Sequence, residues 1–262
     1  SNTGRLGMII PSGWVSTPSA KPLRQLFVQN FRPLSFVSLP FDVFKAYIDT
    51  VIVIAERAKA SKHQNGNDVR LVVFPQRFKI ESVADFKLFE KSANYKEWLS
   101  SDHIEFLITC SSSELKVIQK IRSQPGRLND HVLVKRGIEV FSPQLTKSNL
   151  DNPKPAFTGT LQRYDLRHGQ KGYVAYPPKI EESKPFEYFS SHRILLRQVL
   201  SRKLRLQAVL TNDAFLTNQS VQSLIPINKP TVSLALILGI LNSRLLSWYF
   251  VKYNSVARRD DF

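Results

Sequence analysis

Short apolar runs alternate with amphipathic stretches along the first 110 residues. The runs at 6–11, 35–40, 48–56 and 69–75 are rich in β-branched and aromatic residues and end at prolines or polar turns, which predicts strands. Residues 22–30 place Leu23, Leu26 and Phe27 on one helical face, and residues 83–99 predict a second helix. Strands that alternate with helices indicate an open α/β sheet with helices on its faces.

The pattern after residue 130 is less regular. Residues 131–141 and 172–177 alternate between apolar and polar positions, and residues 204–210 alternate with Arg205 and Gln207 marking an outer face. These segments predict strands of an irregular α+β domain. Residues 193–200 fit either a helix or a strand by pattern alone.

The most apolar window covers residues 231–251. Leu234, Leu238, Leu241, Leu245 and Trp248 recur at steps of four and three, which draws one apolar stripe along a helix. The polar run 242–244 falls in the middle of this window and includes an arginine, which is costly inside a bilayer. We therefore expect a buried helix, whose second half begins at 241–244, and no membrane association.

Charge divides the chain unevenly. Lys and Arg number 37 against 21 Asp and Glu, a net charge of +16, which favours a polyanionic partner such as nucleic acid or an acidic membrane face. Residues 1–110 hold 14 basic and 10 acidic residues, whereas residues 111–262 hold 23 and 11. The serine run 111–113 and the Ser-Gln-Pro-Gly turn at 123–126 mark a boundary, so we expect two domains, 1–110 and 111–262.

The sequence lacks the motifs of disulfide-bonded proteins, zinc sites and nucleotide-cofactor loops. Cys110 is the single cysteine and the five histidines are widely spaced, which argues against a disulfide or a zinc site and favours a cytoplasmic setting. No Gly-x-Gly and no Gly-Lys-Ser/Thr occurs, so no nucleotide-cofactor loop is expected. The chain begins at Ser1 with no secretory signal and its one methionine is Met8, which suggests a piece of a longer protein.

A cluster of basic residues at 163–205 is a candidate nucleic-acid-binding surface. It contains ten Lys and Arg against four Asp and Glu, and residues 191–212 contain no acidic residue. Arginines beside tyrosines supply phosphate contacts and planar surfaces, as nucleic-acid grooves do, although a solvated basic face is the alternative. The candidate DNA contacts are Arg163, Tyr164, Arg167, Lys171, Arg193, Arg197, Arg202, Lys203 and Arg205.

A magnesium nuclease is an alternative reading of the same region. Glu182 and Lys184 have Glu-x-Lys spacing, with Asp165 upstream as a further carboxylate, and such groups can hold Mg²⁺ and activate water. The surrounding segment is polar and bounded by prolines, unlike a rigid buried strand, and residues 114–116 match the same short pattern. A solvated loop is therefore favoured here.

Several segments in order resemble one enzyme family. GRLGMIIPSGW (4–14), PLRQLF (22–27) and FDVFKAYIDTVIVI (41–54) resemble late catalytic-domain segments of adenine-specific DNA methyltransferases of the TaqI-like and type IIG restriction-modification group. RGIEVF (136–141), FTGTLQRYDL (157–166), GYVAYP (172–177), HRILLRQV (192–199), LQAVLTNDAFLTNQSVQSLIP (206–226) and LGILNSRLLSWYF (238–250) are similar to that group's C-terminal target-recognition domain.

The resemblance implies a fold and an activity. Residues 1–110 would be an α/β fragment, the C-terminal part of a Rossmann-like methyltransferase sheet, and residues 111–262 an irregular α+β target-recognition domain. The whole enzyme would flip an adenine out of double-stranded DNA and methylate its exocyclic amine from S-adenosylmethionine. In the family the cofactor loop and the Pro-Pro-aromatic motif lie upstream, so this fragment would bind no cofactor and would act with an upstream catalytic region of the same polypeptide.

The resemblance also implies particular residue roles. Phe44 matches the aromatic residue that stacks on the flipped adenine, with Phe41 as a rival and a core position beside Ile48 as the alternative. Residues 193–199 would form a strand paired with 204–210, so that Arg193 and Arg197 share a face. A binding-only module, either a specificity subunit or an RNA-binding protein, is the second hypothesis.

Overall fold

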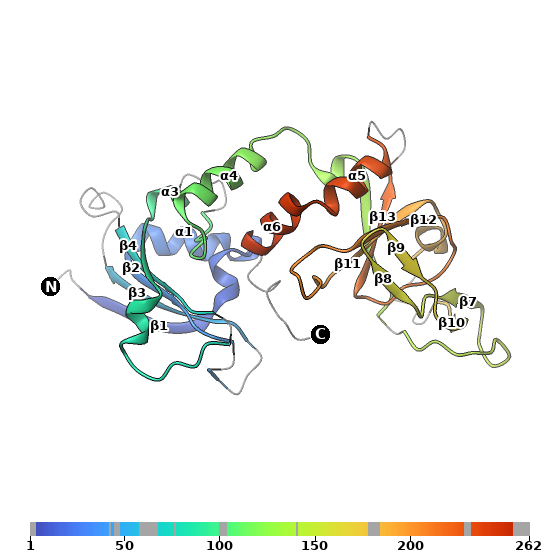
Figure 1. Cartoon of the computed structure of the whole chain (residues 1–262), viewed down its shortest axis with the longest axis horizontal. Helices are drawn as coiled ribbons and strands as arrows, with labels where there is room; N and C mark the ends of the chain where they lie inside the picture. The colour runs from blue at the N-terminus through green and yellow to red at the C-terminus, as the bar shows by residue number, and fades with distance from the viewer. Residues whose placement is uncertain are drawn as a thin grey trace. The chain divides into compact units, whose positions relative to one another are not determined.

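The computed structural model describes residues 4–41, 43–44, 48–57, 68–75, 77–99, 104–139, 141–177, 184–227 and 232–253. The chain divides into two compact units. Unit 1 comprises Ser1–Gln124 with Lys252–Val256, and unit 2 comprises Pro125–Val251 with Ala257–Phe262. Both are mixed α/β structures with their own sheets (Figure 1).

Unit 1 is built on a five-stranded sheet in the order β1-β3-β2-β4-β5. The strands are β1 (Arg5–Pro11), β2 (Phe31–Ser38), β3 (Thr50–Arg57), β4 (Asp68–Val73) and β5 (Glu90–Asn94). Only β2 and β4 pair in parallel, and the other pairs are antiparallel. The strand predictions for this part are confirmed, with β2 beginning four residues earlier than its predicted run.

The predicted long helix at 83–99 is wrong. This segment forms α2 (Asp85–Leu88), strand β5, and α3 (Lys96–Leu99). Strand β5 pairs antiparallel with β4 from Asp68↔Asn94 to Val72↔Glu90. The ladder hydrogen bonds to β4 are a tertiary interaction that the local helical periodicity does not report.

Both faces of the unit 1 sheet are covered by apolar side chains. On one face Val37, Leu39, Val72 and Phe74 form a cluster, against which pack Ile52, Phe78, Ile80, Phe86 and Phe89. On the other, rings gather around Phe36, whose centroid lies 5.7 Å from that of Trp98 and 5.4 Å from that of Phe106. Adjacent residues Phe36 and Val37 point to opposite faces, as strand geometry requires.

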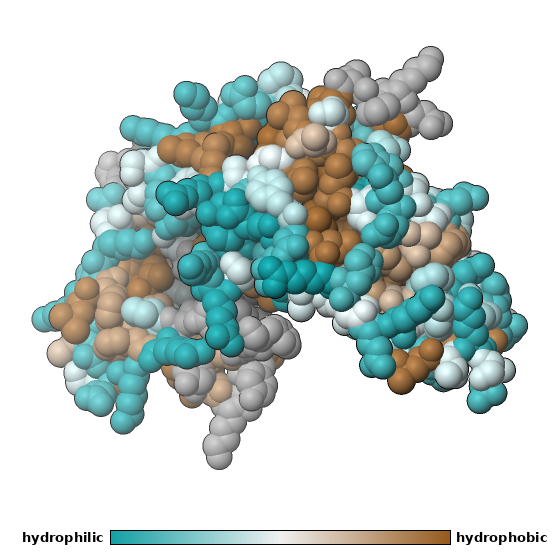
Figure 2. All heavy atoms as spheres, turned by 45° about the vertical axis from the view of Figure 1, so that its right-hand side comes forward, coloured by the Kyte–Doolittle hydropathy of each residue, from teal (hydrophilic) through white to brown (hydrophobic). Residues whose placement is uncertain are grey.

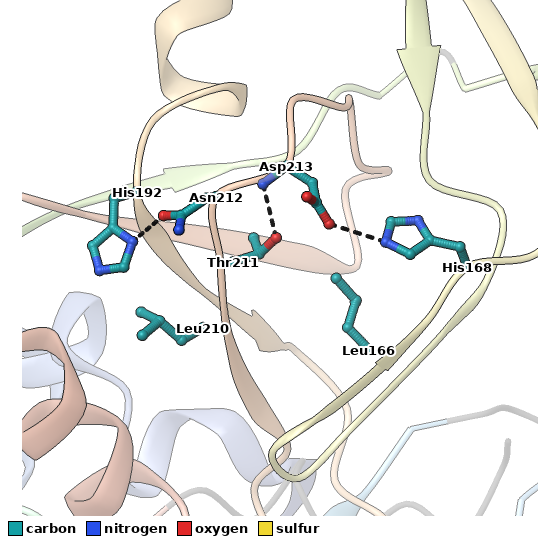
Figure 3. Close-up of a pocket in the computed structure, with 7 residues that line it drawn as sticks. All are labelled: Leu166, His168, His192, Leu210, Thr211, Asn212 and Asp213. Carbon is teal, nitrogen blue, oxygen red and sulfur yellow. Dashed lines mark hydrogen bonds and ion pairs between the residues drawn. The ribbon is translucent and has the colours of Figure 1, made fainter.

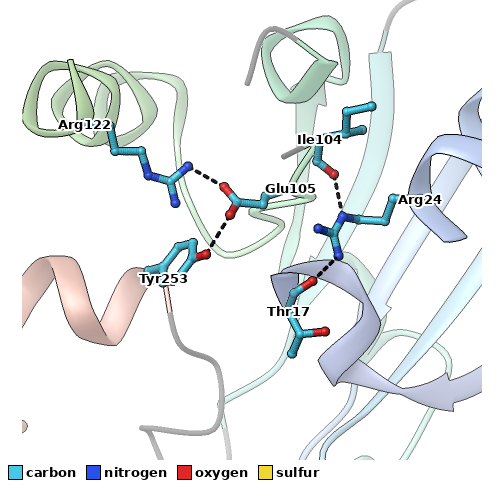
Figure 4. Close-up of polar contacts among 6 residues, drawn as sticks. All are labelled: Thr17, Arg24, Ile104, Glu105, Arg122 and Tyr253. Carbon is cyan, nitrogen blue, oxygen red and sulfur yellow. Dashed lines mark hydrogen bonds and ion pairs between the residues drawn. The ribbon is translucent and has the colours of Figure 1, made fainter. Parts of the chain in front are cut away.

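Helix α1 (Lys21–Asn30) buries a different face from the one predicted. Leu23 and Leu26 are 51% and 58% exposed, whereas Phe27 and Arg24 are buried. The Arg24 guanidinium donates to the carbonyls of Ile104 (2.7 Å), Trp14 (2.7 Å) and Thr17 (2.8 Å), two of which Figure 4 draws. The carbonyls come from the 3-10 helix η1 (Ser12–Val15), the turn before η2 (Pro18–Ala20) and a distant segment, so the burial of this arginine is a tertiary effect.

Helix α4 (Ser112–Arg122) is the last element of the N-terminal segment that forms most of unit 1. Ser111 and Glu114 form a reciprocal capping box, which satisfies two backbone amides at the helix start. At the other end Arg122 is paired with the buried carboxylate of Glu105, which also accepts a hydrogen bond from the Tyr253 hydroxyl (2.7 Å; Figure 4). Lys252 is ion-paired with Glu114 at 2.6 Å.

Unit 2 contains a four-stranded antiparallel sheet in the order β12-β11-β13-β6. Its strands are β6 (Val132–Arg136), β11 (Arg193–Arg197), β12 (Ala208–Thr211) and β13 (Val221–Pro226), preceded by the 3-10 turn η4 (Leu128–Asp130). The predicted pairing of 193–199 with 204–210 is confirmed over Arg193↔Thr211 to Leu196↔Ala208. The outer-face prediction for Gln207 is wrong, because this residue and Val209 are both buried.

Two small antiparallel pairs complete unit 2. They are β7 (Pro153–Ala156) with β10 (Gly172–Ala175), and β8 (Thr160–Gln162) with β9 (Asp165–Arg167), and η6 (Phe186–Phe189) follows in the chain. Leu161 of β8 joins Leu195, Val209, Phe215 and Val221 in one core cluster. The β8–β9 hairpin therefore covers one face of the main sheet (Figure 1).

The apolar window near the C-terminus forms two helices instead of one. Helices α5 (Leu234–Leu241) and α6 (Arg244–Tyr253) are bent by 60°. Leu234, Leu238 and Leu241 are buried against the opposite face of the sheet, but Leu245, the next member of the predicted stripe, is 56% exposed. The stripe fails where Asn242 and Ser243 interrupt the helix, which rotates the following residues to a new face.

The solvent side of these two helices remains apolar. Leu236, Ile240 and Leu245 are each more than half exposed. Figure 2 shows brown apolar side chains gathered in the upper part of the face it draws, with teal polar side chains around them. Within the described residues no single helix has the length and hydropathy to cross a membrane, and α5 with α6 meets those criteria only as a bent pair.

Candidate nucleic-acid interface

The turn of the β8–β9 hairpin presents Arg163 and Tyr164 to solvent. Tyr164 is 54% exposed and adopts a φ of 62°, a left-handed conformation that aromatic residues rarely take. Its backbone amide donates to the Ala208 carbonyl (2.9 Å), which holds the turn beside β12. The Arg163 guanidinium lies 5.6 Å from the centroid of the Tyr164 ring. An exposed, strained aromatic residue beside an arginine is a common feature of functional sites.

A second exposed turn connects β11 to β12. The Ser201 amide donates to the Arg205 carbonyl (2.9 Å), and the Ser201 hydroxyl accepts from the Arg205 amide (3.1 Å). These bonds close a compact loop with Arg202 and Lys203 exposed at its tip. Arg202 and Lys203 are therefore accessible, which both the predicted DNA contact and a solvated basic face require.

Arg205 is fixed in place by the break between α5 and α6. Its guanidinium donates to the Asn242 carbonyl (2.8 Å) and to the Ser247 hydroxyl (3.3 Å). Burial lowers the pKa of Arg205, and the neighbouring charges of Arg163 and Arg244 lower it further. The charges of Arg163 and Arg244, which belong to two other segments, are therefore near enough to act on Arg205. We call Arg163, Arg205 and Arg244 the arginine cluster.

Arg244 is the residue that sequence reasoning missed. The run 241–244 was interpreted as structural, and this holds for Asn242, which is fully buried. Its amide side chain bonds both the Ala208 amide (3.0 Å) and the Ala208 carbonyl (2.9 Å). Arg244 instead is exposed at the start of α6. Its only signal in the sequence is a cation within an apolar window, which by itself does not indicate a surface.

Arg193 is a correction to the candidate list. It is fully buried, and its guanidinium donates to the carbonyls of Ser191 (3.0 Å), Asp213 (2.9 Å) and Phe215 (3.3 Å). Burial lowers its pKa to about 10, so the side chain stays cationic at neutral pH. Because every bond it makes is to the protein interior, Arg193 is unavailable to an external ligand.

The remaining basic candidates are more dispersed. Arg167 is ion-paired with Asp165 (2.7 Å), and the Lys171 ammonium lies 5.9 Å from the centroid of the Tyr173 ring. Arg197 ends β11 and is partly buried. No contact that we observe joins these three to the arginine cluster.

The residues proposed for a nuclease site do not assemble in the described part of the chain. Asp165 is held by Arg167, and the Lys184 ammonium donates to the carbonyls of Arg136 (3.0 Å) and Gly137 (3.1 Å). Glu182 lies outside the described residues. Among the residues that are described, no group of three or more His, Cys, Asp or Glu side chains could hold a metal ion.

Phe44 lies between β2 and β3 and is 43% exposed. Ile48 is 46% exposed, so neither residue belongs to the core of unit 1. The alternative that Phe44 is a core residue beside Ile48 is therefore wrong. Phe41, the rival position, is partly buried.

Comparison with known proteins identifies related sequences. Residues 154–262 match a family model described as the TaqI-like C-terminal specificity domain. The Methanocaldococcus jannaschii protein RM.MjaORFECS2P, whose name describes a type II restriction enzyme and methyltransferase, is 24% identical over 274 residues. That alignment covers 100% of this chain and 22% of the relative, so the chain spans about a fifth of the relative's length.

Two solved structures are also similar. The type IIG restriction endonuclease BpuSI matches 92% of this chain and 36% of its own at 11% identity, with a TM-score of 0.35. The ATP-dependent type ISP restriction-modification enzyme LlaBIII bound to DNA matches 90% of this chain and 20% of its own at 9% identity, with a TM-score of 0.48. Over residues 154–262 this chain is similar to the TaqI-like C-terminal specificity domain family, which confirms the resemblance that its sequence segments indicate.

Proposed function

We propose that this chain is the DNA-recognition part of an adenine-specific DNA methyltransferase or of a fused restriction-modification enzyme. The observation that carries the proposal is the specificity-domain match over residues 154–262, the region that also contains the arginine cluster. Arg163, Arg205 and Arg244 would neutralise backbone phosphates of double-stranded DNA, with Arg202 and Lys203 in the adjoining loop. Electrostatic contact of this kind positions a protein on a duplex before bases are read.

The salt dependence of DNA binding tests this proposal. We expect the chain to bind short duplexes with an affinity that falls steeply as salt rises. Arg163→Gln should weaken binding to duplexes of every sequence and reduce the slope of log K against log salt by about 0.9, the value for one lost phosphate contact.

Lys116→Gln provides the matched control, because Lys116 is an exposed cation of α4 in unit 1 and the charge change is the same. Equal losses in the two variants would mean that net charge, and not the arginine cluster, drives binding. Failure of the unaltered chain to bind any duplex at about 50 mM salt would overturn the proposed function.

Unit 1 would complete a methyltransferase sheet supplied by an upstream region of the same polypeptide. Strand β1 lies at the end of the described sheet, with β3 as its pairing partner. An edge strand presents a row of backbone N–H and C=O groups with which a further strand can pair. The exposed side chains of Met8 (46%) and Ile9 (54%) also leave apolar surface on both faces of β1 for elements that would cover it. Hydrogen exchange should show the outward amides of β1 protected in the full-length protein and exchanging freely in this chain. Equal exchange in both would refute the joined sheet.

The described residues at the carboxyl ends of the parallel strands do not fit the methyl donor. The carboxyl ends of the parallel pair β2 and β4 lead into Leu39–Pro40 and Phe74–Pro75, which offer apolar side chains and no carboxylate for a ribose. The sequence contains no Gly-x-Gly loop. We therefore derive no step through S-adenosylmethionine, and we expect this chain alone to transfer no methyl group.

Phe44 is our proposed stacking partner for a flipped adenine. Its exposure leaves the ring accessible, and stacking on an extruded base is worth about 1–3 kcal/mol. In the full-length enzyme Phe44→Ala should reduce the fluorescence rise of a 2-aminopurine placed at the target adenine, and Phe44→Trp should preserve base flipping. An unchanged signal in Phe44→Ala would assign the stacking role to another residue.

A further inference from the structure

A polar pocket lies beside β12 in unit 2, apart from the residues assigned above. It has a volume of about 320 Å³ and is lined by Leu166, His168, His192, Leu210, Thr211, Asn212 and Asp213. His168 Nε2 is 3.1 Å from Asp213 Oδ2, and His192 Nδ1 is hydrogen-bonded to Asn212 Oδ1 (Figure 3). The His168 and Asp213 side chains are both more than half exposed.

The chemistry of this pocket differs from that of the arginine cluster. No lysine or arginine lines it, and the exposed Asp213 carboxylate would repel a phosphate. The amide and the carboxylate that line it are groups that can bond base edges: Asn bonds adenine N6 and N7, and Asp accepts from cytosine N4. The apolar side chains of Leu166 and Leu210 offer surface to a thymine methyl.

The pocket and the arginine cluster lie at opposite ends of strands β9 and β12. At one end the Tyr164 amide bonds the Ala208 carbonyl, and at the other end His168 pairs with Asp213. His168 is four residue steps along an extended chain from Tyr164, a span of about 13 Å at roughly 3.3 Å per residue. This span is comparable to the width of the DNA major groove, about 12 Å.

Arg193 holds the backbone of the segment that carries Asn212 and Asp213. Its guanidinium binds the Asp213 carbonyl at 2.9 Å and the Phe215 carbonyl at 3.3 Å, and lies 5.0 Å from the centroid of the Phe215 ring. Thr211 accepts the Asp213 amide through its hydroxyl at 3.0 Å. The pocket backbone is thus fixed before any ligand arrives, as a specific reader requires.

We infer that the edges of the target base pairs are read by Asn212, Asp213 and His168 in this pocket, while the arginine cluster holds the flanking phosphates. Arg193 is then a positioning residue, which acts on DNA sequence only through the loop it holds. This inference rests on the proposed function, because it assigns the specificity of the same DNA-binding unit.

Sequence preference and salt dependence separate the two roles experimentally. The chain would select duplexes from a randomised pool, and affinities for the selected and a scrambled duplex would then be measured over a range of salt concentrations. Asn212→Ala and Asp213→Ala should each reduce the preference for the selected duplex by roughly 10- to 100-fold while the salt slope remains that of the unaltered chain.

Gln219→Ala is the control, because Gln219 is an exposed polar residue in a different loop of unit 2 and should change neither quantity. Preference retained in both pocket variants would overturn this inference and leave the proposed function standing, as would selection of no preferred sequence by an unaltered chain that binds duplexes. Absence of any duplex binding would instead refute the proposed function.

Arg193→Lys tests the positioning role. Lysine keeps the charge but lacks the planar fork whose two terminal nitrogens reach the separate carbonyls of Asp213 and Phe215. The variant should therefore lose sequence preference at temperatures where it remains folded, with its affinity for scrambled duplex unchanged. Arg136→Lys is the control, because Arg136 lies in β6 of the same sheet, is not a candidate DNA contact and donates to the Gln219 carbonyl (3.0 Å), so this variant should retain the preference. If Arg193→Lys loses affinity for both duplexes in equal proportion, Arg193 has no positioning role in recognition.

Discussion

Two arginines in different units show how residue roles are decided by distant groups. Arg24 and Arg193 are both fully buried, and each bonds three backbone carbonyls. A guanidinium carries five donors in a fixed planar array, so it can satisfy carbonyls from several segments at once. In both cases the basic side chain stabilises its own unit instead of adding to the surface charge.

Replacing Arg24 with Met should strongly destabilise unit 1. The substitution leaves the carbonyls of Trp14, Thr17 and Ile104 without their buried donor, at a cost of about 1–3 kcal/mol for an unsatisfied group. We expect a loss of about 3–5 kcal/mol in the free energy of unfolding, measured by urea denaturation. Arg24→Lys should lose less, because the ammonium can replace one of the bonds, and equal losses would show that the bond geometry is unimportant.

We expect the backbone conformation of Tyr164 to reduce the stability of the fold while the residue contributes to DNA binding. Its φ of 62° costs energy for any residue with a side chain, and glycine adopts this conformation freely. Tyr164→Gly should therefore raise the melting temperature by a few degrees, corresponding to about 1 kcal/mol, while weakening duplex binding. Leu204→Gly, at a φ of 53°, is the stability control. A lower melting temperature in Tyr164→Gly would mean that the ring contributes more to packing than the strained backbone costs.

At the scale of elements, helix α4 is stabilised both by a capping box that the sequence pattern shows and by an ion pair that only the fold brings about. Its capping box joins Ser111 and Glu114, three residues apart, and is visible in the sequence pattern. The same Glu114 carboxylate pairs with Lys252 at 2.6 Å, a contact that only the fold brings about. Burial would raise the pKa of Glu114, but hydrogen bonds from Lys252 and from Ser111 outweigh this and lower it.

This lowered pKa predicts a pH dependence of stability. Because the folded-state pKa lies below the ordinary value of 4.5, the carboxylate stabilises the fold above that pH, and the contribution is lost as pH falls through the lowered pKa. Glu114→Gln retains the capping geometry but not the charge, so it should cost about 1 kcal/mol at pH 7 and nothing at an acidic pH below the lowered pKa. Urea denaturation at both pH values checks this, and a pH-independent difference would contradict it.

Other elements show where local patterns are insufficient. Strands β3 and β4 follow from runs of apolar and β-branched residues, whereas the pattern at β11 fits a helix as well as a strand. Strand β5, with the sequence Glu-Lys-Ser-Ala-Asn, has no such run and forms because β4 offers an edge to pair with. The break between α5 and α6 is likewise decided by Asn242, whose side chain bonds Ala208 of β12.

At the scale of the whole molecule, two units with separate cores should unfold separately. The core clusters built on β4 and on β11 each lie within one unit. Calorimetry should therefore resolve two transitions, of which Arg24→Met lowers one and Asn242→Ala lowers the other. Asn242→Ala should cost about 2–4 kcal/mol, because the Ala208 amide and carbonyl lose their buried partners. A single transition that both variants shift would mean that the units fold cooperatively.

The sequence by itself determined most of the strands, the uneven charge and the relationship to a specificity-domain family. The strands and the charge follow from residue type and short-range periodicity, which require no knowledge of the fold. The family relationship follows from the resemblance of several segments in the same order. The tertiary structure alone decided which arginines reach solvent, that Arg244 joins Arg163 and Arg205, and that Arg193 supports a loop. The reason is physical: a buried guanidinium needs carbonyls from segments far apart in the chain, 80 residues away in the case of Arg24 and Ile104, and no local pattern records such partners.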